Sequence, residues 1–190
     1  MVITGAAGGV GYAYAGEFLD RGYDVVLCDV RDCGSALASL ESRAAATGAR
    51  AYSTKCDVTD SESVEALGRF ARDKLGTVGY WINNAGINGG RRALADVPMS
   101  QVELVVKVNL LGILFGTKVA MEIMSDQVRG RSHPRCVCVW GGGVACVFGH
   151  VGRRSPSFRI LLRTHRQISG EKKKKKMNGG RDFLIHIREI

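Results

Sequence analysis

The first thirty residues place a glycine-rich turn between two apolar runs. The first run leads into "TGAAGGVG", a helical pattern follows, and the second run ends at Asp29. Within the helical part, Val10, Tyr14 and Phe18 recur at helical spacing, and Gly22 stands where a left-handed residue commonly ends a helix. The pattern therefore predicts a strand, a turn, a helix and a second strand.

The same alternation of apolar runs and helical patterns continues to about residue 125. It predicts strands over 23–29, 50–58 and 79–86, and helices over 35–47, 61–75 and 101–125. Thr59 with Glu62, and Ser100 with Glu103, have the spacing of a capping box, which would begin the last two helices. Strands that alternate with helices indicate an α/β fold with a doubly wound parallel sheet.

The glycines of the first turn point to a nucleotide. Gly5, Gly9 and Gly11 let the backbone pass closely under a pyrophosphate, which the following helix meets with its free N–H groups. Asp29 lies 18 residues after Gly11, close to the spacing of about 20 expected for the carboxylate that binds a ribose hydroxyl. Together these features predict a Rossmann-like, dinucleotide-binding unit.

Charge divides the chain into two parts. Its 190 residues carry a net charge of +9 and are 45% hydrophobic, enough for one substantial core. Residues 1–127 hold 12 Lys/Arg and 15 Asp/Glu, whereas the remainder hold 15 and 3. We therefore expect a dinucleotide-binding domain over 1–130 and a basic, divergent, poorly ordered tail over 131–190, leaving the sheet incomplete at its C-terminal edge.

The basic tail has several interpretations. Five lysines at 172–176 suit a nuclear-localisation patch, a nucleic-acid contact or a solvated charge run. We favour a fourth hypothesis, that the tail is out-of-frame or intron-derived translation, because the charge and the periodicity change abruptly. Nucleic acid is therefore not the expected partner.

Hydropathy and cysteine spacing predict neither a membrane-spanning helix nor a metal site. The apolar segment "NLLGILFGTKVAM" is shorter than the roughly 18 residues of a membrane-spanning helix, so we expect no transmembrane segment, although contact with a membrane surface stays open. The six cysteines form no CxxC pair, so we expect reduced thiols of an intracellular compartment and no metal site.

Four motifs in register resemble the short-chain dehydrogenase/reductase family. They are "TGAAGGVG" (4–11), "CDV" (56–58), "NNAG" (83–86) and "VNLLG" (108–112). Within that family, "WINNAGINGGRRAL" and "GYAYAGEFLDRG" look like the chlorophyll(ide) b reductases of photosynthetic eukaryotes. This resemblance implies an oxidoreductase that reduces the 7-formyl group of chlorophyll(ide) b, a porphyrin aldehyde, in a chloroplast.

The resemblance also assigns roles to residues. Gly5, Gly9 and Gly11 would line the pyrophosphate, Asp57 and Val58 the adenine, and the "NAG" residues the adenosine or ribose. The complete predicted cofactor set is Thr4, Gly5, Gly9, Val10, Gly11, Asp29, Asp57, Val58, Asn84, Ala85 and Gly86. Asn109 matches the asparagine whose main chain holds a water in the proton relay. The cofactor is NAD or NADP: the Asp29 carboxylate favours NAD, while Arg31 suits a 2′-phosphate.

The family's reacting groups are missing. The resemblance places a serine after the fifth strand and a Tyr-x-x-x-Lys on the next helix, but "RCVCVW" (135–140), the candidate fifth strand, is followed by glycines. The residues four positions after the five tyrosines are Gly16, Phe18, Leu27, Cys56 and Asn84. We therefore expect this chain to be inactive or nearly so. The alternative function is a non-catalytic dinucleotide-binding partner subunit, which joins a complete reductase or a second copy through the 101–125 helix.

Overall fold

The fold begins with the predicted strand, turn and helix. The computed structural model describes residues 1–88, 90 and 93–127, and the backbone of strands over 135–140, 143–152, 155–163 and 183–185. The elements run in the order β1 (Val2–Thr4), α1 (Gly9–Asp20), β2 (Val25–Asp29), α2 (Gly34–Thr47), β3 (Ala51–Lys55), α3 (Ser61–Leu75), β4 (Tyr80–Asn83), η1 (Leu94–Asp96), α4 (Met99–Val106), η2 (Lys107–Leu111), α5 (Gly112–Gln127), β5 (Arg135–Trp140), β6 (Gly143–Gly152), β7 (Ser155–Arg163) and β8 (Phe183–Ile185).

The strands form one sheet in the order β3-β2-β1-β4-β5-β6-β7-β8. The first five pair in parallel, which confirms the doubly wound α/β prediction and places "RCVCVW" beside β4. Strands β6, β7 and β8 add to this edge in antiparallel directions, where the sequence predicted no strands. The division into a domain and a tail near residue 130 remains a prediction.

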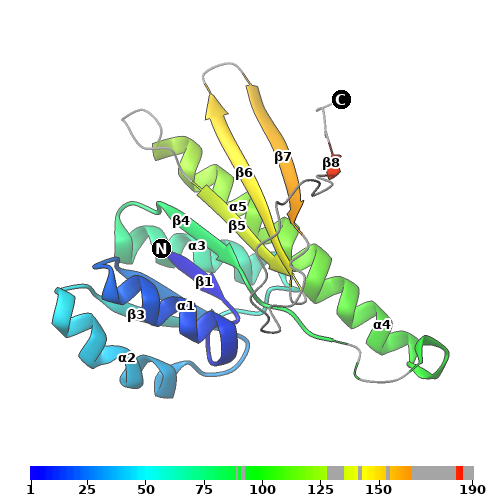
Figure 1. Cartoon of the computed structure of the whole chain (residues 1–190), viewed down its shortest axis with the longest axis horizontal. Helices are drawn as coiled ribbons and strands as arrows, with labels where there is room; N and C mark the ends of the chain where they lie inside the picture. Colours follow the sequence, from blue (N-terminus) through cyan, green and yellow to red (C-terminus); the bar gives the residue numbers. More distant parts are fainter. Residues whose placement is uncertain are drawn as a thin grey trace, which may run out of the picture.

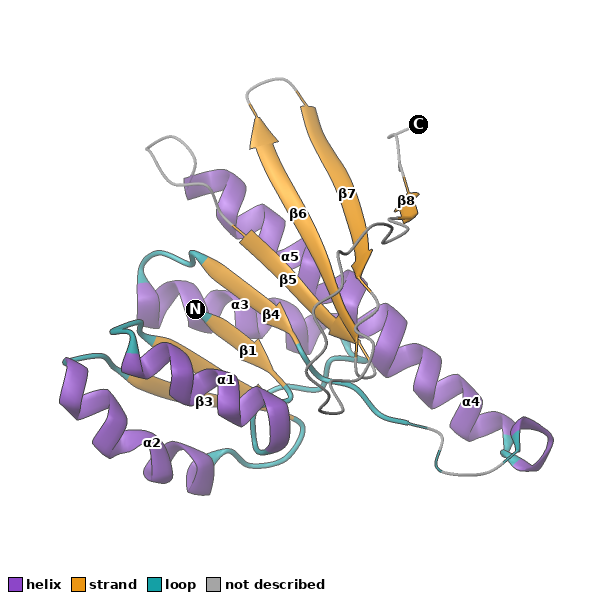
Figure 2. Ribbon diagram, in the orientation of Figure 1, coloured by secondary structure: helices purple, strands orange, loops and turns teal. Residues whose placement is uncertain are grey.

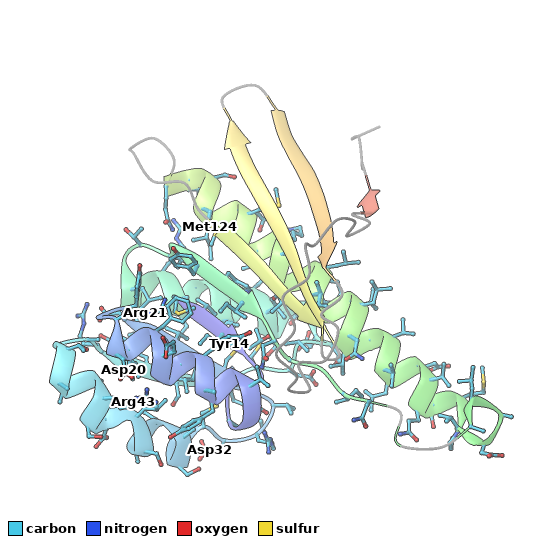
Figure 3. All side chains as sticks on the ribbon, in the orientation of Figure 1. Tyr14, Asp20, Arg21, Asp32, Arg43 and Met124 are labelled. Carbon is cyan, nitrogen blue, oxygen red and sulfur yellow. The ribbon has the colours of Figure 1, made fainter. Side chains whose placement is uncertain are left out.

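Helices cover both faces of the parallel strands, α1 and α2 on one face and α3 and α5 on the other (Figure 1, Figure 2). Successive strand residues point to opposite faces. Ile3 and Leu27 accordingly join the core under α1 and α2, whereas Val2 and Val26 join the core under α3 and α5. A salt bridge from Arg43 of α2 to Asp20 of α1 links the two helices of the first layer (Figure 3).

The structure confirms the predicted end of α1 and corrects the predicted starts of α3 and α4. Gly22 has a left-handed φ of +78° just after α1, as predicted. Helix α3 is capped by Asp60, whose side chain accepts the Glu62 N–H, rather than by Thr59. Asp60 has the extended backbone of an N-cap residue, and the Thr59 hydroxyl instead donates to Asp57 Oδ1.

The predicted 101–125 helix is longer at both ends and starts differently from the prediction. It begins at Met99 without a side-chain cap, because Pro98 precedes the first turn and its carbonyl accepts the N–H groups of Gln101 and Val102. Ser100 therefore lies inside α4 rather than before it. A five-residue π turn, η2, joins α4 to α5 and contains Asn109.

Helices α4 and α5 with their π turn form one helix of 29 residues, whose most apolar 18-residue stretch has a mean hydropathy of 1.7. By length and composition alone this helix is long and apolar enough to cross a membrane, a test that a core helix also passes, so the absence of a transmembrane segment stays a prediction. Its second half nevertheless packs as a core helix, with Val119, Ala120 and Ile123 buried in the cluster that includes Trp81 and Leu67. Figure 1 shows α4 projecting beyond the sheet.

Candidate functional site

A cleft of about 940 Å³ opens where the carboxyl ends of β1, β2 and β4 meet the first glycine turn. Ligands of open α/β sheets bind at this edge, outside the carboxyl ends of the strands. Among the predicted site residues, those that line the cleft are Gly5, Gly9, Val10, Asp29, Asp57, Val58, Asn84, Ala85, Gly86 and Asn109. The structure therefore brings four separate sequence motifs to one cavity.

Two predicted residues, Thr4 and Gly11, lie beneath the cleft wall instead. A Cβ on Gly11 would come within 2.4 Å of the Gly5 carbonyl oxygen, so this glycine lets α1 pack against the turn. Gly5 itself has φ +66° and leaves no room for a Cβ, which would lie 2.7 Å from the Ala85 Cα. Glycine is required at both positions, at Gly5 by conformation and by close approach.

Thr4 joins the first turn to the end of β4. Its Oγ1, in a side chain only 2% exposed, accepts the N–H groups of Asn84 and Ala85, each at 3.0 Å. In return, the Asn84 side-chain amide donates to the carbonyl oxygens of Thr4 and Gly5, both at 3.0 Å. These bonds fix the turn against the "NNAG" segment.

Asp29 sits at the end of β2 with both carboxylate oxygens engaged. Oδ2 accepts the Ala7 N–H at 3.1 Å, and Oδ1 accepts the Arg31 backbone N–H at 3.0 Å and its Nε at 3.3 Å. Burial raises the pKa of the carboxyl group, but the bonds from Arg31 and Ala7 outweigh burial and leave that pKa below its ordinary value. Asp29 is therefore ionised at neutral pH and also anchors the glycine turn.

The loop after β3 is tied down on both sides of Val58. Asp57 Oδ1 accepts the backbone N–H and the hydroxyl of Thr59, and the Asp57 N–H donates to Ser63 Oγ. Val58 is 9% exposed and lines the cleft. Asp57 thus shapes the loop through its own side chain, while Val58 offers an apolar surface.

Asn109 holds the segment that follows β4. Its Oδ1 accepts the Ile87 N–H at 2.8 Å and its Nδ2 donates to the Ile87 carbonyl at 2.7 Å, so both ends of the amide are used. Asn109 lies in the π turn, a local widening frequently found at functional sites. Through these bonds the helix positions Gly86 and Ile87 at the cleft.

Sequence reasoning missed part of the cleft wall. Beyond Arg31, which it did consider, the additional lining residues are Gly8, Tyr14, Val30, Cys56, Thr59, Ile87, Leu104 and Val108. Leu104 and Val108 are four apart on the long helix, and this spacing, which places them on one face, was the available signal. Tyr14 belongs to the residues of α1 that recur at helical spacing, from which the sequence predicted only the helix.

The described cysteines Cys28, Cys33 and Cys56 are buried free thiols. Burial raises the pKa of the Cys33 thiol to about 11, so it is protonated at neutral pH. Among the side chains of residues 1–88, 90 and 93–127, no cluster of three His, Cys, Asp or Glu residues is arranged to hold a metal ion.

Fold and cleft agree with the comparison to known families. The family model described as short chain dehydrogenase matches residues 1–132, so the chain belongs to the short-chain dehydrogenase family. The match ends close to the predicted change near residue 130.

Within that family, the chain is similar to two named reductases of plants. The chain is 37% identical over 131 residues to chlorophyll(ide) b reductase NOL, chloroplastic, of Arabidopsis thaliana, covering 68% of this chain and 37% of that protein. It is 35% identical over 146 residues to probable chlorophyll(ide) b reductase NYC1, chloroplastic, of Oryza sativa subsp. japonica, covering 68% of this chain and 29% of that protein. The chain thus spans about a third of the length of these relatives.

Solved structures show the same fold. The crystal structure of levodione reductase superposes with a TM-score of 0.63 at 28% identity, over 72% of this chain and 52% of that one. NAD⁺-bound xylitol dehydrogenase superposes with the same score and identity, over 72% of this chain and 50% of that one. Proteins of this family and fold bind nicotinamide dinucleotides.

Proposed function

We propose that the cleft binds a nicotinamide dinucleotide through its adenosine and pyrophosphate end. The observation that carries this proposal is the joining of the glycine turn to the β4 end by Thr4 and Asn84, with Asp29 beside the turn. The cradle fits a pyrophosphate because Gly5 and Gly9 have positive φ and a Cβ placed on Gly9 would meet no atom within 4 Å. The adenine would lie against Val58, and the ribose beside Asp29.

NAD is the better fit of the two cofactors. The ionised Asp29 carboxylate accepts a hydrogen bond from a 2′-hydroxyl and repels a 2′-phosphate. Arg31 is paired with that carboxylate, but its side chain is 69% exposed, so its guanidinium remains within reach of a phosphate. We therefore expect NADH to bind more tightly than NADPH, and Asp29→Ser to narrow or invert the difference.

Calorimetric titration of both cofactors into the full chain and two variants tests this preference. Asp29→Ser should change the NADH to NADPH affinity ratio by about tenfold or more. The matched variant Arg31→Ala should weaken NADPH and leave NADH nearly unchanged. Equal binding of both cofactors by the wild-type chain and Asp29→Ser would overturn the assignment of Asp29.

The proposed reaction of the lineage is reduction of the 7-formyl group of chlorophyll(ide) b to hydroxymethyl, in a chloroplast. A bound reduced nicotinamide supplies the hydride for such a reduction. This chain has the residues for the adenosine end, yet its sequence contains no Tyr-x-x-x-Lys to protonate the developing alkoxide. We therefore propose that the chain by itself binds cofactor and reduces its porphyrin aldehyde at most very slowly.

A second candidate function is that of a non-catalytic partner subunit. It is favoured by the exposed apolar residues Val106, Leu110 and Leu114, which recur every four positions along α4, the π turn and α5. This face would pair with a second copy or with a complete reductase.

Hydride transfer distinguishes the two functions. The assay mixes the purified chain with a porphyrin aldehyde and NADH or NADPH and follows loss of nicotinamide absorbance. Cofactor binding without turnover supports the partner subunit, whereas turnover that requires the chain supports a working reductase and contradicts the expected inactivity.

A further inference from the structure

Helix α5 touches the cleft wall at a second place, one turn beyond Asn109. Gly112, the first residue of α5, faces Val58 of the loop after β3. A Cβ built on Gly112 would lie 2.8 Å from Val58 Cγ2, 3.0 Å from its Cβ and 3.2 Å from its carbonyl oxygen. The first distance is too short for any carbon contact, and the other two are tight, so the absence of a side chain lets helix and loop meet.

Helix propensity does not explain a glycine at this position. Gly112 has the backbone angles of an ordinary right-handed helix, φ −59° and ψ −38°. Alanine is the stronger helix former there, and glycine loses more backbone entropy on folding. The contact with Val58 is therefore the physical reason for glycine.

The loop around Val58 has little freedom to move away. Thr59 and Ser63 bond to Asp57 on either side of the turn, and Cys56 N donates to the Asp29 carbonyl at 2.9 Å. A side chain on Gly112 would therefore displace Val58 as a unit. Because Val58 lines the cleft, this displacement changes the shape of the cavity.

We propose that Gly112 is a positioning residue for the adenosine end of the dinucleotide, because its missing side chain sets where Val58 stands in the cleft. The inference rests on the proposed function, which places the adenine against Val58. One continuous helical segment then fixes two walls of the site: Asn109 holds Ile87, and Gly112 holds Val58.

The test measures binding of ADP-ribose, which lacks the nicotinamide, to the full chain and Gly112→Ala by calorimetry. We expect Gly112→Ala to bind about tenfold more weakly, a loss of about 1.4 kcal/mol. Gly68→Ala is the matched control: its Cβ would lie 2.5 Å from Val119 Cγ1, between α3 and α5, and Gly68 does not line the cleft. It should lower the thermal midpoint comparably and leave ADP-ribose affinity within about twofold of wild type.

A double variant tests the contact itself. Val58→Ala removes the Cγ2 atom nearest to the new side chain, so Gly112→Ala/Val58→Ala should bind ADP-ribose more tightly than the two single effects added together predict. If Gly112→Ala does not fold, a folded double variant with measurable binding supports the inference, and an unfolded one overturns it.

Results that contradict the role of Gly112 can be told apart from results that contradict dinucleotide binding. Wild-type affinity in Gly112→Ala, or an equal loss in Gly68→Ala, would overturn the role of Gly112 while leaving dinucleotide binding intact. If the wild-type chain binds no ADP-ribose, the proposed function is wrong and this inference falls with it.

Discussion

At the scale of single residues, the site depends on polar side chains that bind backbone rather than ligand. Thr4, Asp29 and Asn109 each bond to main-chain N–H groups of another segment. A buried N–H without an acceptor is costly, so these side chains determine which loops lie together. The walls of the cleft are thus held together by hydrogen bonds within the protein itself.

Replacing Thr4 by valine should destabilise the chain and weaken cofactor binding. The change keeps the shape but removes the hydroxyl that accepts the Ala85 N–H, whereas the Asn84 N–H also donates to the Ile82 carbonyl. We expect a loss of about 1–3 kcal/mol in the free energy of unfolding, measured by urea titration. Thr4→Ser retains the hydroxyl and should lose much less; equal losses in both variants would show that the methyl group matters instead.

The Asp29 carboxylate should make part of the stability dependent on acid pH. Its pKa is lowered in the folded chain, so its contribution is fully present above the unfolded value of about 3.9 and is lost as the pH falls through the lowered folded value. The difference in unfolding free energy between the wild-type chain and Asp29→Asn should stay constant from pH 7 to about 5 and shrink in more acid solution.

Urea titrations across this pH range check the prediction. Subtracting the variant removes the acid-dependent contributions of Asp20 and Asp24, whose pKa values are also lowered. A difference that grows as the pH falls would contradict the assigned direction of the shift.

At the scale of elements, the start of α3 can be tested by asking whether Asp60 or Thr59 caps the helix. Asp60→Ala removes the side-chain acceptor of the Glu62 N–H and should cost about 0.5–2 kcal/mol of stability. Thr59→Ala removes only a bond to Asp57 and should cost less. Thermal unfolding of the two variants ranks them, and a larger loss for Thr59→Ala would restore the original capping-box prediction.

Patterns of local spacing predicted the elements, and tertiary contacts decided the details. The glycine turn, Asp29 and the "NNAG" segment were predictable because each motif is continuous in sequence. Asp60 and Thr59 are both good caps by residue type, and the backbone of the turn, which is extended at Asp60, selects Asp60. The pairing of Asn109 with Ile87 joins residues 22 apart through a π turn, and no sequence periodicity contains that information.

In the cleft, too, local sequence predicted some residues and tertiary contacts decided others. Val58 was predicted to contact the adenine, but its dependence on Gly112 follows from how closely α5 approaches the sheet. Strands β6 and β7 were not predicted because their segment lacks the alternating pattern that identifies a strand with one buried face.

At the scale of the whole molecule, charge and apolar surface indicate different partners. Residues 1–127, which form the cleft, carry a net charge of −3, and an acidic balance does not favour binding to nucleic acid. The projecting helix instead exposes Val106, Leu110 and Leu114, each about half exposed. Protein association through this helix is therefore the interaction that we propose.

A charge placed on the exposed helix face should reduce association. In sedimentation velocity, Leu110→Asp is expected to shift the full chain toward monomer, because burying an unpaired carboxylate in an apolar interface is costly. Leu94→Asp is the matched control, since Leu94 is 77% exposed but lies outside this helix. If the wild-type chain sediments as a monomer with and without a complete reductase, the partner-subunit hypothesis is wrong.

Binding of NADH to the full chain tests the central claim most directly. The glycine turn, Asp29 and the "NNAG" segment predict saturable binding with one NADH per chain, followed by nicotinamide fluorescence and displaced by ADP-ribose. Failure of NADH to bind, or binding that ADP-ribose does not displace, would contradict the assignment of this cleft to the adenosine end of a dinucleotide.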